Sequence, residues 1–317
     1  MKVLVTGGAG FIGSHVAKAL VARGDEVVIV DNMNDYYDPT LKESRLKEVV
    51  PAGVPFYMVD IANYEELSSI CKEHSFDAIC HLAAQAGVRY SLENPSAYEQ
   101  TNNQGTLNIL ELARHNSIKN VIYASSSSVY GANTKIPFSE SDPVEKPMSL
   151  YAATKRSNEL MAYTYHSLYG LNCTGLRFFT VYGPYGRPDM ALFLFTKAIL
   201  EGEPINVFNY GDMERDFTYV DDIVAGVLSA IDKSYPYEIF NLGGDHPIKL
   251  SYFIETIEKE LGKEAEKNLL PLQPGDVPRT MADLTKAKEM LGFNPQTRIE
   301  EGIKNFIQWY KEYYSVQ

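Results

Sequence analysis

The stretch LVTGGAGFIGSH, residues 4–15, decides the fold of this 317-residue chain. A short β-branched apolar run over residues 2–5 leads into it, and apolar residues recur at helical spacing over residues 11–21. The glycines therefore lie in the turn between a strand and a helix. Such a turn is suited to bind a phosphate, because a helix begins with free N–H groups and the positive end of its dipole.

The glycine spacing indicates which kind of phosphate compound binds. Gly7, Gly10 and Gly13 give G-x-x-G-x-x-G, and Gly8, Gly10 and Gly13 also give G-x-G-x-x-G. A dinucleotide site needs glycines for a tight turn, for close backbone approach to a pyrophosphate and for close helix packing. A purely structural glycine turn is the alternative. Asp31, at the end of the next expected strand, favours the dinucleotide, because its carboxylate would accept hydrogen bonds from an adenosine ribose.

Asp31 also predicts NAD rather than NADP. Its charge would repel a 2′-phosphate, and no arginine follows it closely in the sequence. Asp60 ends the third expected strand in the segment MVDI, where a short acid could hold adenine. A structural role, in which Asp60 caps the end of the strand, is an equally simple alternative.

Composition limits the partners. The net charge is −12 and no run is rich in Lys or Arg, so neither nucleic acid nor a membrane surface is an expected partner. No apolar stretch approaches the roughly 18 residues that span a bilayer, and a strand at residue 2 leaves no room for a signal peptide. The expected location is cytoplasmic. Cys71, Cys80 and Cys173 have neither disulfide nor zinc spacing, so no metal is expected.

Strand-like and helical patterns alternate through the first half of the chain. Strands are expected at 2–5, 26–30, 55–59, 78–82, 120–124 and 172–178, and helices at 15–22, 64–71, 105–115 and 149–169. This alternation predicts an α/β fold with a Rossmann-like doubly wound parallel sheet.

The alternation of strand and helix patterns ends after Thr180, where loops rich in proline and glycine precede amphipathic helices. We expect a smaller C-terminal substrate-binding lobe here, because a single hydrophobic core rarely keeps growing in a chain as long as this one. The segment YEIFNLGG again resembles a strand that ends in glycines, so the chain should return to the sheet. The predicted NAD-binding domain comprises 1–179 and 218–247, and the predicted lobe comprises 180–217 and 248–317.

Tyr151 and Lys155, in the segment YAATK, are candidate catalytic residues. Their i, i+4 spacing puts both on one face of a helix for which Ser149 is a plausible N-cap. A nearby ammonium and a positive nicotinamide would lower the pKa of the tyrosine, which could then act as a general base. An exposed helix pair is the alternative. The segment YASSSSVYG, residues 123–131, favours catalysis because it carries hydroxyls to the edge of the sheet where ligands bind.

These segments together resemble the extended short-chain dehydrogenase/reductases, and within them the nucleotide-sugar 4-epimerases. The resemblance covers nearly the whole chain. It is carried by TGGAGFIGSH, Asp31, HLAAQAGVRYS (81–91), SSSSVYG, YAATK, RFFTVYGPYGRPDM (177–190) and RDFTYVDD (215–222). The segments HLAAQAGVRYS and RFFTVYGPYGRPDM are most similar to the epimerases that interconvert UDP-glucuronate and UDP-galacturonate.

The resemblance implies a chemistry. NAD stays bound, takes a hydride from C4 of the sugar and returns it to the opposite face after the 4-keto intermediate rotates. Tyr151 would remove and restore the O4 proton, and Lys155 would anchor the nicotinamide ribose and tune Tyr151. Ser126 would hydrogen-bond O4, with Ser127 and Ser128 as close alternatives.

The resemblance also implies the cofactor and substrate contacts. The cofactor residues would be Gly7, Gly10, Phe11, Ile12, Gly13, Asp31, Asn32, Asp60, Ile61, Leu82, Ala83, Ala84, Asn102, Ser125, Tyr151, Lys155 and Phe178. The substrate residues would be Ser127, Ser128, Thr180, Arg187, Arg215, Asp276 and Arg279. Asn102 could instead cap the helix near residue 105. His81 is better explained as a packed histidine than as a metal ligand, because no second ligand is spaced to join it.

Within the substrate set, Arg215 is assigned to the diphosphate, Asp276 to the uridine ribose and Arg279 to the same neighbourhood. Thr180 and Arg187 are our candidates for recognising the C6 carboxylate, since arginine offers paired donors that stay protonated. A surface salt bridge is the alternative for each arginine.

The residues before VYG separate related reactions. The similar 4,6-dehydratases carry an Asp-Glu pair there and the similar decarboxylases carry a Glu, whereas this chain has Ser127 and Ser128. A 4-keto uronate is a β-keto acid that loses carbon dioxide readily, so an epimerase must restrain its carboxylate. The resemblance therefore favours 4-epimerisation of UDP-glucuronate.

Other functions stay open. A 4-epimerase of UDP-glucose or UDP-N-acetylglucosamine, a non-catalytic protein that senses nucleotide sugars, and a net dehydrogenase would each share these motifs. The resemblance also implies a homodimer through two helices of the larger lobe, although no stripe in the sequence indicates one.

Overall fold

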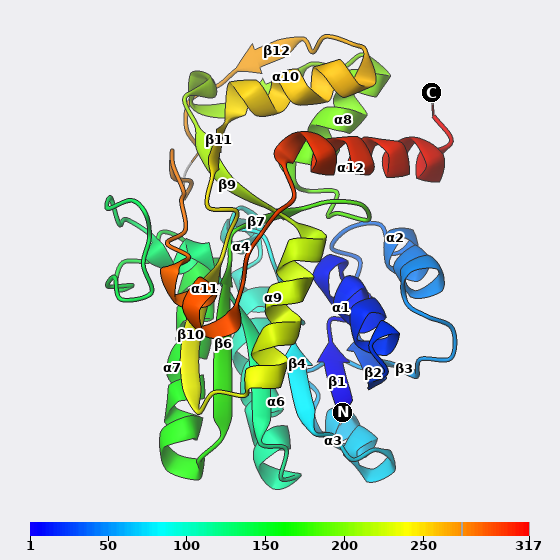
Figure 1. Cartoon of the computed structure of the whole chain (residues 1–317), viewed down its shortest axis with the longest axis vertical. Coiled ribbons are helices and arrows are strands. Elements are labelled where there is room, and N and C mark those ends of the chain that lie inside the picture. Colours follow the sequence, from blue (N-terminus) through cyan, green and yellow to red (C-terminus); the bar gives the residue numbers. More distant parts are fainter. Residues whose placement is uncertain (274, 317) are drawn as a thin grey trace.

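The computed structural model describes residues 1–273 and 275–316. Its centre is a seven-stranded sheet with the strand order β10-β6-β5-β4-β1-β2-β3, in which all neighbouring strands are parallel (Figure 1). The strands are β1 Lys2–Thr6, β2 Glu26–Asp31, β3 Phe56–Met58, β4 Ala78–His81, β5 Asn120–Ser126, β6 Asn172–Phe178 and β10 Tyr237–Leu242. The order reverses beside β1, as in a doubly wound Rossmann sheet, so the predicted α/β fold is confirmed.

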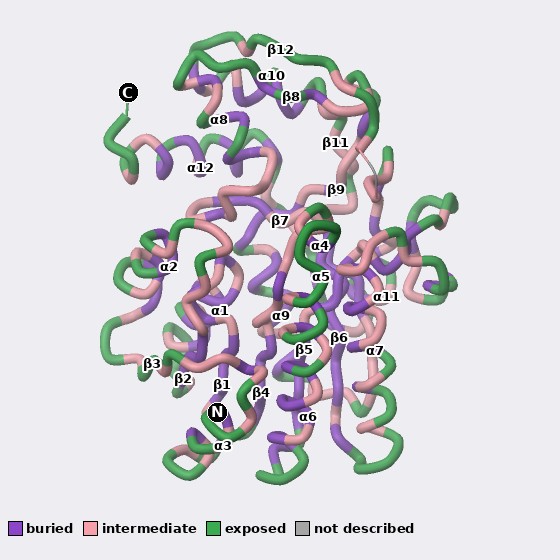
Figure 2. Tube along the Cα trace, turned by 180° about the vertical axis from the view of Figure 1, so that it is seen from behind, coloured by how far each residue is buried: buried purple, intermediate pink, exposed green. Residues whose placement is uncertain are grey.

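Helices cover both faces of this sheet. They are α1 Phe11–Ala22 and α9 Val220–Lys233 on one face, and α3 Tyr64–Glu73, α6 Gly105–His115 and α7 Leu150–Tyr169 on the other. Alternate strand residues point to opposite faces: Val3 and Val5 join the core under α1, and Leu4 joins the core under α3. The strands are therefore apolar on both faces and appear as the buried centre of Figure 2.

The smaller lobe lies beyond the C-terminal ends of the parallel strands (Figure 1). Its three-stranded sheet has the order β11-β9-β7, and a further parallel pair joins β12 to β8. The elements are β7 Thr180–Tyr182, β8 Ile205–Val207, β9 Glu214–Tyr219, β11 Pro247–Lys249, β12 Lys267–Leu269, α8 Ala191–Glu201, α10 Leu250–Leu261 and α12 Ile299–Tyr314. As expected, β10 returns to the large sheet. One later helix, α11 Thr285–Leu291, also packs on β10 and α9 of the larger lobe.

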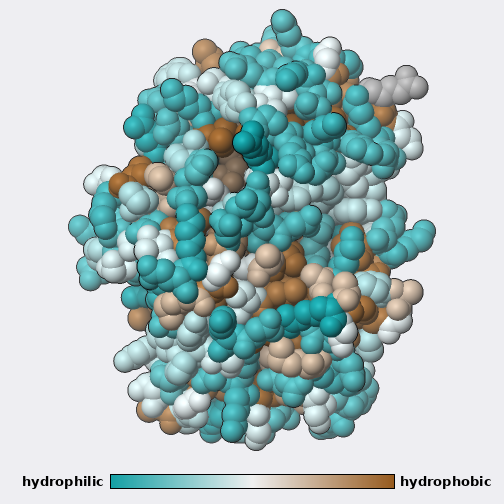
Figure 3. All heavy atoms as spheres, viewed as in Figure 1, coloured by the Kyte–Doolittle hydropathy of each residue, from teal (hydrophilic) through white to brown (hydrophobic). Residues whose placement is uncertain are grey.

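Short helical segments complete the chain and lie mostly in loops near the strand ends. They are α2 Thr40–Ser44, η1 Arg45–Val49, α4 Tyr90–Glu93, α5 Pro95–Tyr98, η2 Glu99–Gln104, η3 Ser127–Tyr130 and η4 Phe208–Gly211. No helix in the described part of the chain is both long enough and apolar enough to cross a membrane. Hydrophobic residues on the face drawn in Figure 3 form small separate groups among hydrophilic ones.

The observed ends of the helices and strands show which local sequence signals were sufficient to predict them. The helix α7 begins as expected, because the Ser149 hydroxyl accepts a hydrogen bond from the Ala152 amide at 3.1 Å, and it ends at Gly170 with a left-handed φ of 66°. The expected strand at 120–124 extends to Ser126, and α1 begins at Phe11 rather than at residue 15. The strand β5 therefore ends on two hydroxyl residues, Ser125 and Ser126, and α1 starts directly after Gly10.

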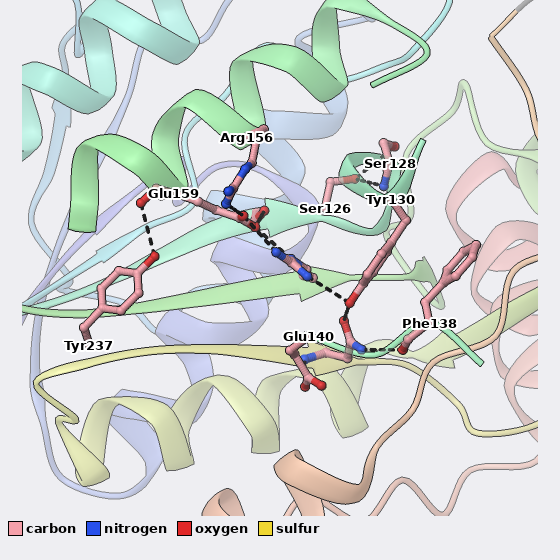
Figure 4. A network of polar contacts seen from close by, with 11 residues as sticks. Ser126, Ser128, Tyr130, Phe138, Glu140, Arg156, Glu159 and Tyr237 are labelled. Atoms are coloured by element: carbon pink, nitrogen blue, oxygen red, sulfur yellow. Dashed lines mark hydrogen bonds and ion pairs between the residues drawn. The ribbon is translucent and has the colours of Figure 1, made fainter. Parts of the chain in front are cut away.

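A buried ion pair attaches α7 to the sheet (Figure 4). Glu159 of α7 accepts hydrogen bonds from Arg177 of β6, with Nε–Oε1 at 2.8 Å and Nη2–Oε2 at 2.9 Å. The Ser125 hydroxyl donates to Glu159 at 2.7 Å, and Arg177 Nη1 donates to the Tyr130 hydroxyl, which donates to Asn241 of β10. Burial alone would raise the pKa of Glu159, but these contacts hold it below its usual value. The network ties α7 to β5, β6 and β10.

We predict that Glu159→Gln destabilises the protein by about 3–5 kcal/mol, because it leaves the buried Arg177 guanidinium without its counter-charge. Urea denaturation followed by circular dichroism measures the free energy of unfolding. The double variant Glu159→Leu with Arg177→Met is the control, and it should lose less stability than the single variant. A single variant within about 1 kcal/mol of the parent would contradict this account of the pair.

Candidate active site

A cavity of about 1080 Å³ lies between the two lobes, at the C-terminal ends of the parallel strands. Most of the residues that the sequence singled out line it. They are Gly7, Gly10, Phe11, Ile12, Gly13, Asp31, Asn32, Ile61, Leu82, Ala83, Ala84, Ser125, Ser126, Ser127, Ser128, Tyr151, Lys155, Phe178, Thr180, Arg187, Arg215 and Asp276. Asp60, Asn102 and Arg279 are absent from the lining described in residues 1–273 and 275–316.

The glycine turn has no room for side chains. Gly7 has a φ of +71°, and a Cβ there would lie 2.6 Å from the Ala83 amide nitrogen. A Cβ on Gly13 would lie 2.2 Å from the Gly7 carbonyl oxygen. The helix α1 starts directly after Gly10, with neither a side-chain cap nor an acidic residue in its first turn. Its first N–H groups therefore suit a pyrophosphate, and the turn fits a dinucleotide.

Asp31 ends β2 beside this turn and is 8% exposed. Its carboxylate accepts hydrogen bonds from the Ala9 amide at 3.2 Å and the Met33 amide at 2.9 Å. Lys42 Nζ lies 3.9 Å from Asp31 and donates to Asn34, and burial lowers the pKa of Lys42. Lys42 also lines the cavity. Sequence reasoning missed this cation, because nothing local indicates that α2 folds back onto the end of β2.

Asp60 and Asn102 form hydrogen bonds with groups of neighbouring loops. Asp60 accepts a hydrogen bond from the Asn32 side chain at 3.0 Å and one from the Ala62 amide at 2.8 Å. Asn102 is 1% exposed, accepts from the Gln85 amide at 2.8 Å and donates to the Gln85 carbonyl at 3.1 Å. Both residues brace the backbone that follows a strand end, so they shape the cavity from behind.

His81 is packed inside the sheet. Its Nδ1 lies 2.8 Å from the Thr6 hydroxyl and its Nε2 lies 3.1 Å from the Thr106 hydroxyl. Burial lowers its pKa to about 3, so the ring is neutral at physiological pH. No cluster of three or more His, Cys, Asp or Glu within the described residues is arranged to hold a metal ion.

Tyr151 and Ser126 meet where α7 begins and β5 ends. Burial raises the pKa of Tyr151, whereas a hydrogen bond with Ser126 and the charge of Arg187 act to lower it. The Ser126 hydroxyl accepts from the Ser128 amide and donates to the Ser128 hydroxyl, both at 3.1 Å (Figure 4). The Ser126 hydroxyl, which acts on the phenol, is thus itself held by Ser128.

Lys155 lies one turn further along α7 and is 3% exposed. Its ammonium donates to the Ala124 carbonyl oxygen at 2.8 Å, and burial lowers its pKa to about 8. This contact holds the ammonium against the backbone of β5, on the cavity wall that also carries Ser125. The geometry suits a group that anchors a ligand hydroxyl there.

Two groups of charged residues lie in the cavity. Arg187 pairs with Asp189, and its charge acts on Tyr151. Arg215 pairs with Asp276 through Nη2 and Oδ1 at 2.7 Å, and burial lowers the pKa of Arg215. Arg89 also lines the cavity, and its charge repels that of Arg215.

Arg89 and Arg279 show the limits of assigning roles from motifs. Arg89 was within the segment HLAAQAGVRYS but received no role, although its guanidinium lies 5.0 Å from the ring centre of Phe208. The Arg279 side chain is 55% exposed, and its Nε lies 3.8 Å from Glu214. Arg279 thus lies next to Glu214 of the strand that carries Arg215, but its exposed side chain is not part of the described cavity lining. The sequence did offer a signal for Arg89, because it is an arginine within a quoted motif that starts at the C-terminal end of a strand, where ligands bind.

Comparisons with known proteins define the family. A family model described as the NAD dependent epimerase/dehydratase family matches residues 3–243. The chain is 49% identical over 333 residues to UDP-glucuronate 4-epimerase 4 of Arabidopsis thaliana, covering 99% of this chain and 76% of the relative. The chain therefore belongs to the NAD-dependent epimerase/dehydratase family.

Two solved structures are similar over nearly the whole chain. The UDP-glucuronic acid 4-epimerase of Bacillus cereus, in complex with UDP-glucuronic acid and NAD, has a TM-score of 0.93 and 36% identity, covering 99% of this chain and 100% of that one. The UDP-glucose 4-epimerase of Thermotoga maritima, with UDP-glucose, has a TM-score of 0.91 and 33% identity at the same coverage. The protein is an epimerase, that is an isomerase, and its cofactor is NAD.

We predict that Gly13→Ala lowers the affinity for NAD at least about tenfold, because its Cβ would push the Gly7 carbonyl and open the turn that holds charge-assisted hydrogen bonds. Nucleotide released from purified protein and quantified by chromatography measures the loss. Gly24→Ala is the matched control: Gly24 follows α1, has a φ of +93° and faces open space. The control should lose stability but keep NAD, and equal NAD content in both variants would refute the prediction.

Proposed function

We propose that this enzyme interconverts UDP-glucuronate and UDP-galacturonate by epimerisation at C4. The observation that carries the proposal is the placement of a partly buried guanidinium, that of Arg187, in the same cavity as Tyr151, where its charge acts on the phenol. A cation near the reacting phenol suits a sugar that carries a carboxylate. The names of the Arabidopsis and Bacillus proteins support the same substrate.

The proton chemistry belongs to Tyr151. Bound NAD would supply the hydride acceptor for C4 and then return the hydride. Tyr151 takes the O4 proton as the C4 hydrogen leaves and gives it back when the C4 hydrogen returns. The Ser126 hydroxyl holds O4 in line with the phenol, and Lys155 anchors the nicotinamide ribose from the wall of β5.

The two ends of the substrate need different contacts. At one end we assign the diphosphate to Arg215, with Arg89 adding positive charge, and the uridine ribose to Asp276. At the other end we assign the C6 carboxylate to Arg187, Thr180 and the hydroxyls of Ser127 and Ser128, all of which line the cavity. Neither Ser127 nor Ser128 can act as the carboxylic acid that a dehydratase or decarboxylase needs at that place.

A neutral substrate is the second candidate. The Thermotoga protein is named for UDP-glucose and is nearly as similar in structure as the Bacillus protein. An enzyme for UDP-glucose or UDP-N-acetylglucosamine would use the same Tyr151 and Ser126. The cation at Arg187 distinguishes the two, because its N–H groups that Asp189 leaves free would bind a carboxylate more strongly than a neutral hydroxymethyl group.

We predict that the purified protein converts UDP-glucuronate to its C4 epimer without added NAD and without net formation of reduced cofactor. Tyr151→Phe should slow turnover by about 100-fold or more, because the O4 proton loses its acceptor. An NMR time course distinguishes the epimer, a decarboxylated pentose and unreacted substrate.

Tyr169→Phe, an exposed position on the same helix, is the control and should keep full activity. Full activity of Tyr151→Phe would require a different base. Conversion of UDP-glucose but not of UDP-glucuronate would favour the second candidate.

We also propose a homodimer through α6 and α7 in the cytoplasm. Three apolar side chains of α7 support the interface: Leu160 is 53% exposed, Tyr163 55% and Leu168 65%. Leu160 and Tyr163 are neighbours at i, i+3 spacing, and all three side chains are exposed to solvent rather than packed in the core under α7.

We predict that Leu160→Asp shifts the protein from dimer to monomer in size-exclusion chromatography with light scattering, because a carboxylate would be buried at the contact. Met58→Asp, at an exposed site on β3 at the opposite edge of the sheet, should leave the mass unchanged. A monomeric parent protein, or a dimer that survives Leu160→Asp, would contradict this interface.

A further inference from the structure

Arg187 does not face the cavity as a free cation. Its Nε donates to Asp189 Oδ1 at 3.0 Å and its Nη2 to Asp189 Oδ2 at 2.5 Å. The Asp189 carboxylate thus occupies one edge of the guanidinium. Nη1 has no hydrogen-bond acceptor among the described residues, so it is the nitrogen that a ligand in the cavity can engage with both N–H groups.

A second donor holds Asp189. The Tyr36 hydroxyl donates to Asp189 Oδ2 at 3.0 Å, although the two residues are 153 positions apart in the chain. Burial alone would raise the pKa of Asp189, but the charge and hydrogen bonds of Arg187 and the hydrogen bond from Tyr36 keep it below its usual value. Asp189 therefore stays ionised and remains paired with Arg187.

Tyr36 is itself held by its surroundings. Its ring packs on that of Tyr90 with centroids 4.9 Å apart. Gly87, with a φ of +100°, lies so close that a Cβ there would be 2.6 Å from the Tyr36 hydroxyl oxygen. Tyr36 follows Asp31 and Asn32 in the chain, so it links the cofactor side of the cavity to the arginine that faces the sugar.

The backbone next to Arg187 is tied to the same region. Arg45 is fully buried and pairs with no carboxylate in the described part of the chain. It donates to the Tyr185 carbonyl at 3.0 and 2.8 Å, to the Gly186 and Ala9 carbonyls at 3.3 Å each, and to the Tyr37 hydroxyl at 2.6 Å. The loop that carries Arg187 is thus fixed to the glycine turn, and Tyr36 and Asp189 set the direction of the side chain.

We propose that Asp189 and Tyr36 are positioning residues that aim Nη1 of Arg187 at the carboxylate of the sugar, and that this aim protects the oxidised intermediate from decarboxylation. The inference rests on the proposed function. It assigns roles to two residues that do not take part in the proton or hydride transfer.

The chemistry explains why the aim matters. In the 4-keto uronate, loss of carbon dioxide breaks the C5–C6 bond. Its electron pair moves toward the C4 carbonyl oxygen to form an enolate, which then takes a proton at C5. Negative charge therefore leaves the carboxylate as the bond breaks. A guanidinium fixed on the carboxylate stabilises the ground state more than this transition state, so it slows the loss.

The test is Tyr36→Phe, which removes one hydroxyl and keeps the ring. Tyr57→Phe is the matched control, because Tyr57 also donates to a carboxylate, that of Glu73, but stands on β3 outside the cavity lining of the described residues. NMR of a UDP-glucuronate reaction gives the ratio of decarboxylated pentose to epimer, and absorbance gives any reduced cofactor left behind.

We expect Tyr36→Phe to raise the ratio of decarboxylated product to epimer about tenfold, as for loss of a hydrogen bond to a charged group, while NAD content and melting temperature stay near those of the parent. Asp189→Asn should raise the ratio at least as much, and Tyr57→Phe should leave it unchanged. If Tyr36→Phe fails to fold, Asp189→Asn decides.

The outcomes separate the two proposals. If the parent enzyme converts UDP-glucuronate and both variants keep its product ratio, the inference is wrong and the proposed function stands. If the parent enzyme does not act on UDP-glucuronate, the proposed function fails, and this inference with it. A lower kcat with an unchanged ratio would also overturn it, since a general structural defect gives that result.

Discussion

The buried pair of Glu159 and Arg177 is the contact on which the site depends. Candidate groups such as Asp31 and Ser126 stand at the ends of strands, so the sheet places them. Tyr151 and Lys155 instead stand on α7, and a helix can slide or rotate on a sheet surface. The pair removes that freedom, because it joins the helix to β6 and, through Ser125, to the strand that carries Ser126. A hydrophobic contact of equal area would hold α7 less specifically, since it has no preferred direction.

Local sequence patterns were sufficient for the larger lobe. The glycine spacing, the apolar strand runs and the capping serine each describe neighbours in the chain, and the structure confirms the parallel sheet and the limits of α7. The position of the helix α11 was harder to predict from the sequence. It lies in a segment that we assigned to the smaller lobe, but it packs on β10 and α9, and helical periodicity alone does not tell which lobe a helix covers.

Most of the predicted site residues line the cavity, but the contacts between their side chains were not predictable from the sequence. Motifs brought Arg187, Arg215 and Asp276 to the list, yet no motif showed that Asp189 takes one edge of Arg187 or that Tyr36 approaches from a distant loop. Such contacts depend on side chains that meet only after both lobes have formed. The hydrogen bond from the Lys155 ammonium to the Ala124 carbonyl of β5 was likewise not apparent from the YAATK motif, which describes only neighbours along α7.

The pairing of cations with acids resolves a conflict in this cavity. The proposed substrate carries a diphosphate and a uronate, both of which need positive charge, yet a partly buried guanidinium without a partner is costly before that substrate binds. Arg187 with Asp189 and Arg215 with Asp276 reduce that cost, and each acid takes only part of its guanidinium. The remaining N–H groups then have fixed directions. In the proposed reaction the sugar must turn between two hydride transfers while its diphosphate stays in place, so a firmly oriented cation at each end allows rotation about the bonds between them and restrains the carboxylate in both sugar orientations.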